Sequence, residues 1–170
     1  MTRIYVPATI EILGRLVADQ EFDPMSRTAF AVTATLREAY SSGDDEELAE
    51  VAMDEAARAS LRLIAGRVAE GGAEGVRFRR AVVAADVEEV TPRPDLDDAV
   101  VRLPGPVTIA QVAAVHVDLE EAERDVERAA SVIDEADLGD SDAEFVLGDA
   151  EDHALAWYAT QELPFLLELL

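Results

Sequence analysis

The chain alternates short apolar runs with longer segments of helical periodicity, and this alternation limits the folds open to it. A short apolar or alternating run predicts a strand, whereas apolar residues spaced three and four apart predict a helix. The run from Ala81 to Ala85 is apolar throughout, as expected for a central strand covered on both faces. The predicted strands span residues 3–6, 29–32, 79–87, 100–103, 112–117 and 155–158.

The longest predicted helix runs from about Asp45 to Glu70. Asp44 and Glu47 have the spacing of a capping box at its start, and Gly71 is suited to its end. The other predicted helices span 10–17, 34–40, 119–135 and 161–170, whereas residues 137–153 are predicted to form an acidic loop.

Strands that alternate with helices are typical of an α/β domain. We therefore expect one domain over residues 1–170, with helices packed on a mixed or mostly parallel sheet of about five to six strands. The alternative is an α+β fold made of two ferredoxin-like halves. PATIEIL and YATQELP both predict a strand, a threonine cap and a helix, which is the kind of echo that a duplication would leave.

The net charge of −23 limits the partners of the chain. All 14 basic residues are arginine, and residues 81–170 carry 23 of the 37 acids but only 4 of the arginines. Proteins normally bind nucleic acids and anionic membranes through basic side chains, so neither is an expected partner of this acidic chain. A protein partner or self-association as a homodimer fits better, and the apolar helix at 165–170 is the candidate surface.

The residues that several kinds of catalytic or binding site require are absent from the chain. There is no cysteine, which excludes thiol catalysis and disulfides and agrees with a cytoplasmic location. No apolar run is long enough to cross a bilayer, and the N-terminal residues do not resemble a signal peptide. No lysine is present for a phosphate-binding loop, and no serine lies in a G-x-S-x-G elbow. No cofactor is expected.

The histidines have carboxylate neighbours and are the remaining catalytic candidates. His116 and Asp118 are two residues apart on a predicted strand, so their side chains share a face. Asp152 and His153 are adjacent in the stretch EDHALAWYATQEL. If the two segments met, the four residues could be catalytic, and His116, Asp152 and His153 could bind a metal ion. For Asp118 the favoured interpretation is a helix cap paired with Glu121, and for a histidine beside valines it is packing.

Two other patterns have simpler interpretations. The basic cluster of Arg77, Arg79 and Arg80 is expected to pair with surplus carboxylates rather than to bind an anion. The segment from Asp140 to Glu151 spaces its acids like an EF-hand loop, but Phe145 stands where the turn requires glycine, so calcium binding is not expected.

Several strings resemble a family of small uncharacterised actinobacterial proteins: RIYVPAT, TAFAVTATLREAY, EAARASLRL, RRAVVAADV, VAAVHVD and EDHALAWYATQEL. The likeness spans nearly the whole chain but implies no activity, cofactor or site residue. The function expected from the residues is a non-enzymatic, acidic binding or interaction protein. The alternative is a small-molecule or metal-dependent enzyme that uses the histidines and their neighbouring carboxylates.

Overall fold

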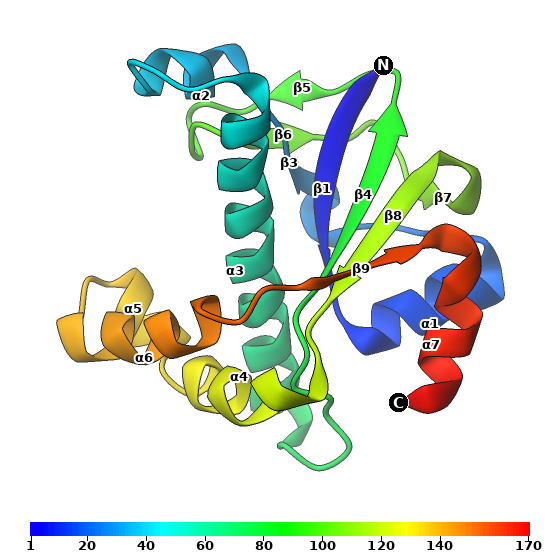
Figure 1. The fold of residues 1–170 in the computed structure, drawn as a ribbon, viewed down its shortest axis with the longest axis vertical. Helices are drawn as coiled ribbons and strands as arrows, with labels where there is room; N and C mark the ends of the chain where they lie inside the picture. Colours follow the sequence, from blue (N-terminus) through cyan, green and yellow to red (C-terminus); the bar gives the residue numbers. More distant parts are fainter.

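A seven-stranded antiparallel sheet forms the centre of the computed structural model, which describes residues 1–170 (Figure 1). The strand order is β5-β6-β3-β1-β4-β8-β9, and β2 and β7 form a separate pair. The strands are β1 (Thr2–Ala8), β2 (Glu21–Phe22), β3 (Thr28–Phe30), β4 (Ala81–Val87), β5 (Thr91–Pro92), β6 (Val100–Arg102), β7 (Val107–Thr108), β8 (Val112–Val117) and β9 (Ala156–Ala159). The α-helices are α1 (Ile10–Asp19), α2 (Ala34–Ala39), α3 (Asp45–Gly71), α4 (Glu123–Ala130), α5 (Ile133–Asp137), α6 (Ser141–Glu151) and α7 (Leu163–Leu169).

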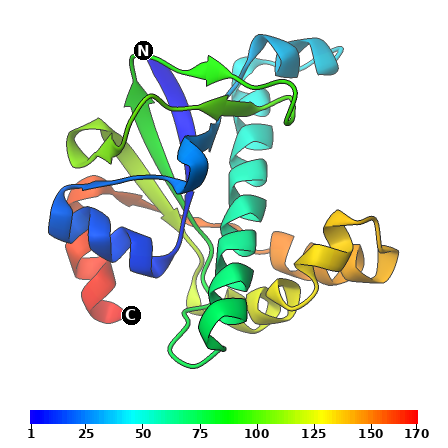
Figure 2. The same ribbon diagram turned by 180° about the vertical axis from the view of Figure 1, so that it is seen from behind.

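Helices cover both faces of the sheet. The alternation of β1 shows this directly, because Ile4 and Val6 belong to one core cluster while Tyr5 packs against another. Helices α1 and α7 lie side by side on the Ile4 face, as the view from behind shows (Figure 2). The long helix α3 crosses the opposite face (Figure 1). On that face the buried Ser60 hydroxyl donates to the Ala8 carbonyl and accepts from Ala81 N–H, which fixes α3 to β1 and β4.

A third cluster lies beside the sheet, where α4, α5 and α6 pack against α3 (Figure 1). We call these three helices, residues 123–151, the helical lobe. Its buried positions include Val126, Ile133 and Leu147, which contact Leu61 and Ile64 of α3. The lobe is therefore a small core of its own on one side of α3.

The predicted mixed or mostly parallel sheet of five to six strands is wrong, because every neighbouring pair of strands is antiparallel and there are seven strands. Strands β3 and β4 do run in the same direction and are connected through α3, as the alternation predicts. However, β1 lies between them and is antiparallel to both. Strands β8 and β9 are neighbours, yet the chain between them turns through the whole helical lobe and returns antiparallel.

The duplicated ferredoxin-like alternative is also not observed. The order of β1 to β4 is strand, helix, strand, strand, two helices and strand, but β5 to β8 come before the next α-helix. The two echoing threonines differ as well. Thr9 caps α1 by accepting from Ile12 N–H, whereas the Thr160 hydroxyl donates to the Val112 carbonyl.

The predicted acidic loop at 137–153 is wrong, because most of it forms α6. Asp140 caps this helix by accepting a hydrogen bond from Ala143 N–H at 2.9 Å. Ala143, Leu147 and Ala150 are buried at helical spacing, so the helix is stabilised by packing despite its acids. The EF-hand-like spacing therefore lies on a helix.

Candidate functional site

Two of the residues selected from the sequence, Asp152 and His153, line a cleft of about 740 Å3. One wall is α3, and the other is α6 with the segment that leads into β9 (Figure 1). Apolar residues of both walls line the cleft, among them Met53 and Leu61 on one side and Leu147 and Leu155 on the other. The volume lies within the range usual for ligand sites.

The cleft carries carboxylates on both walls: Glu50, Asp54, Glu55, Glu151 and Asp152. Glu151 lies 4.0 Å from an Arg58 nitrogen, and the other four make no ion pair within that distance. Its two arginines, Arg58 and Arg80, are both bound to acids on neighbouring elements. Four of the five carboxylates therefore have no ion-pair partner, and the lining carries more negative than positive charge.

Arg80 forms a buried ion pair with Asp118 beside the cleft. Both oxygens of the Asp118 carboxylate are used: one accepts from Arg80 Nε at 2.8 Å and the other from Nη2 at 2.9 Å. Nη2 also donates to the carbonyls of Ala150 and His153, at 2.9 and 3.0 Å. Asp118 is fully buried. The side chain at 80 thus joins β8 to the end of α6 and holds the turn that carries His153.

The interpretation of Asp118 as a helix cap is wrong. The following 3₁₀ turn begins after Leu119 and receives no side-chain cap. Instead, Asp118 accepts from the backbone N–H of Arg80 as well as from its guanidinium. The partner of Asp118 is therefore a residue 38 positions away in the sequence, immediately before β4.

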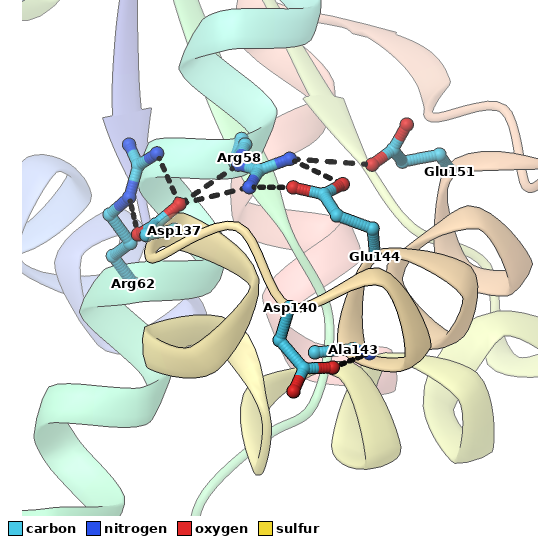
Figure 3. Close-up of polar contacts among 7 residues, drawn as sticks. All are labelled: Arg58, Arg62, Asp137, Asp140, Ala143, Glu144 and Glu151. Carbon is cyan, nitrogen blue, oxygen red and sulfur yellow. Dashed lines mark hydrogen bonds and ion pairs between the residues drawn. The ribbon is translucent and has the colours of Figure 1, made fainter.

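Arg58 and Arg62 of α3 hold the helical lobe in place (Figure 3). Arg58 donates to Asp137 at 2.9 Å and to Glu144 at 2.8 Å, and Arg62 donates to Asp137 at 2.7 Å. These contacts lower the pKa of the Asp137 carboxyl, chiefly through Arg62 and then Arg58. The hydrogen bond from Arg58 likewise lowers the pKa of Glu144. Both acids remain charged and keep Arg58 engaged.

On the α3 wall, the pKa values of the acids shift in the opposite direction. Burial raises the pKa of the Asp54 carboxyl, and the nearby Glu50 raises it further. Burial also raises the pKa of Glu55, and Asp97 adds to the effect. In each case the charged carboxylate is less favourable than it is in water. A cation in the cleft would relieve this cost.

We expect Glu55→Gln to stabilise the protein slightly at pH 7, by roughly 0.5 kcal/mol, because solvent screens this half-buried group. A raised pKa means that the charge destabilises the folded state above that pKa. The penalty disappears as the pH falls towards the ordinary value of 4.5. Urea unfolding at pH 7 and near pH 4 tests this, with Glu74→Gln in the exposed loop after α3 as the control. An equal gain for both variants at pH 7 would contradict the prediction.

The two histidines occupy different surroundings. His153 Nε2 lies 2.8 Å from an Asp125 carboxylate oxygen of the helical lobe. His116 lies on β8 opposite Trp157 of β9 and does not line the cleft. Partial burial lowers the pKa of His116, and the positive charge of Arg3 adds to this. No group of three or more His, Asp or Glu side chains in the chain is placed to hold a metal ion.

Comparison with known proteins places the chain in a family. The model of a family of unknown function, DUF6912, matches residues 2–167. The chain belongs to this family. Neither the curated proteins nor the solved structures contain a significant match to it. The DUF6912 match spans both walls of the cleft, so the site lies within the family's own sequence.

The α3 wall of this DUF6912 chain was not predicted from the sequence as part of a site. One signal was present: Glu50 and Asp54 are like charges four residues apart on a predicted helix, an arrangement that destabilises an isolated helix. The basic cluster behaves largely as predicted, since Arg79 pairs with Glu123 at 2.9 Å and Arg80 pairs with Asp118. Arg77 is the exception, because it has no Asp or Glu partner and donates to a main-chain oxygen of Leu170, the last residue of the chain.

Proposed function

We propose that the protein is a non-enzymatic binding protein whose cleft between α3 and α6 receives a short basic segment of a protein partner. The supporting observation is the cleft itself: its apolar lining can pack against a chain, and its unpaired carboxylates can accept arginine or lysine side chains. The raised pKa values of Asp54 and Glu55 add to this, since a cation would offset the cost of their charge.

A basic partner fits better than a second copy. Phe165 and Leu169 of α7 are exposed apolar residues, as the sequence predicts, and could support a homodimer. Two copies, however, each carry a net charge of −23 and repel one another overall. The same charge opposes nucleic acid and anionic membranes, which we continue to leave out of the partners. None of the helices is long and apolar enough to cross a bilayer.

The enzymatic alternative has less support. Of its four residues, only Asp152 and His153 line the cleft. Asp118 is fully buried beneath Arg80, and His116 lies on the sheet. We therefore favour binding over catalysis. We also propose a cytoplasmic location, on the composition of the chain, and an actinobacterial origin, on the resemblance of its sequence strings to that family.

Binding of an arginine-containing tetrapeptide tests the proposal, with the same peptide carrying neutral citrulline as its control. We expect amide shifts at the residues of both cleft walls, and an affinity about tenfold lower for the citrulline peptide because charged hydrogen bonds are lost. A triple variant, Glu50→Gln with Asp54→Asn and Glu55→Gln, should weaken binding by a similar factor.

The matched control removes three negative charges elsewhere, by Glu88→Gln, Glu89→Gln and Asp134→Asn. These exposed acids make no ion pair. If the control triple weakens peptide binding as much as the cleft triple, attraction comes from the overall charge and the proposed site is wrong. Amide shifts that are confined to α7 on addition of the peptide would also contradict the proposed site.

A further inference from the structure

Two of the arginines that have no aspartate or glutamate partner line a second site. Ten of the 14 arginines lie within 4.0 Å of an acid. The four that do not are Arg15, Arg77, Arg102 and Arg124. Two of these four, Arg15 and Arg77, line one pocket of about 250 Å3 between α1 and α3.

The absence of a partner for Arg15 is not due to a lack of acids. Glu11 and Asp19 stand four residues before and after it on α1, the usual spacing of helical ion pairs. Glu11 pairs instead with Arg67 at 3.2 Å, and Arg15 forms no ion pair. Arg77 donates through Nη2 to a main-chain oxygen of Leu170, the last residue of the chain, at 2.5 Å, and its Nε and Nη1 make no hydrogen bond. Both guanidinium groups keep donors available for a ligand.

The lining of this pocket combines positive charge with apolar surface. It contains four arginines, the two above with Arg62 and Arg67, against two glutamates, Glu11 and Glu70. This local excess of positive charge stands out in a chain of net charge −23. Beside the arginines lie six apolar residues, including Leu63 and Val76. Guanidinium groups bind carboxylate and phosphate oxygens in a fixed fork geometry, and apolar walls suit a ligand body.

We propose that this pocket binds a small organic anion, with its carboxylate or phosphate group on Arg15 and Arg77 and its apolar body against Leu63 and Val76. The site is separate from the acidic cleft, because the two sets of lining residues do not overlap. It also gives Arg77 the anion-binding role that the basic cluster as a whole does not have.

Amide-shift titration at low ionic strength tests the proposal with three probes: phenyl phosphate, inorganic phosphate and neutral benzyl alcohol. Phenyl phosphate should shift the amides of residues 9–15 and 62–77 and bind more tightly than either of the other two. Arg15→Gln and Arg77→Gln should each weaken the binding of phenyl phosphate about tenfold, as expected for the loss of a charge-assisted hydrogen bond. Leu63→Ser should lower the affinity for phenyl phosphate but leave the affinity for inorganic phosphate unchanged.

Arg124→Gln is the matched control, because Arg124 also lacks an acid partner but lies on α4, away from the pocket. The Arg124→Gln variant should bind phenyl phosphate as tightly as the unchanged protein does. Equal losses in Arg124→Gln and Arg15→Gln, or equal binding of phenyl phosphate and inorganic phosphate, would overturn the proposal. The cleft triple variant should bind phenyl phosphate normally, so the two proposals can fail separately.

Discussion

Replacing Asp118 with alanine should lower the free energy of unfolding by about 3–5 kcal/mol, because it leaves the Arg80 charge buried without its partner. Arg80 is only 4% exposed, so water cannot substitute for the carboxylate. The variant also loses the acceptor of the Arg80 backbone N–H, at 2.8 Å. Urea unfolding with linear extrapolation measures the change.

Asp95→Ala is the control for this prediction. Asp95 pairs with Arg93 at 2.7 Å, a contact as short as that of Asp118, but in the solvent-exposed loop between β5 and β6. Exposed pairs contribute little, so a much smaller change is expected than for Asp118→Ala. The double variant Asp118→Ala with Arg80→Met should recover part of the loss, because it removes the unpaired charge. A loss for Asp118→Ala no larger than that for Asp95→Ala would show that burial of the pair is not the source of its stability.

Leu147→Ala should cost about 2–5 kcal/mol, the usual range for a leucine truncated in a close-packed core. Leu147 is fully buried in the cluster formed by the helical lobe and α3, and it also lines the cleft. The cavity would therefore loosen α6 against α3. Hydrogen exchange should show lost protection first in α4, α5 and α6.

Phe145→Ala provides a comparison on the same helix, because Phe145 is 77% exposed and its removal opens no cavity. Its effect should stay within about 0.5 kcal/mol. If hydrogen exchange in Leu147→Ala rose equally in β1 and β4, the lobe would unfold only together with the sheet, contrary to the prediction.

Local features of the fold were predictable because their causes lie within a few residues. Asp44 caps α3 by accepting from Glu47 N–H at 2.9 Å. The apolar run at 81–85 lies in β4, an interior strand of the sheet. In each case the pattern and the contact that it predicts lie within one element.

The errors arose where distant parts of the chain decide the outcome. The direction of a strand depends on its neighbours, and nothing local shows that β1 separates β3 from β4. Asp118 has the local spacing of a cap, but a buried arginine on the next strand offers stronger contacts. For α6, the acidic composition obscured the helical spacing of Ala143, Leu147 and Ala150, which could have been found.

The site was only partly visible for the same reason. Asp152 and His153 were selected from the sequence, but the opposite wall comes from α3, about 100 residues earlier. Residues so far apart come together only through the packing of the lobe on α3. The pairing of Arg58 with Asp137 and Glu144 reflects this packing, and no spacing in the sequence indicates it.

The contacts of Arg80 have a consequence for the entropy of binding. Its guanidinium holds the carbonyls of Ala150 and His153 while Asp118 holds the guanidinium, so the end of α6 is fixed to the sheet before any ligand arrives. A partner entering the cleft would not have to order this wall. Since the cost of ordering loops is subtracted from the affinity of a complex, such preorganisation allows even a short segment to bind with a small entropic penalty on the protein side.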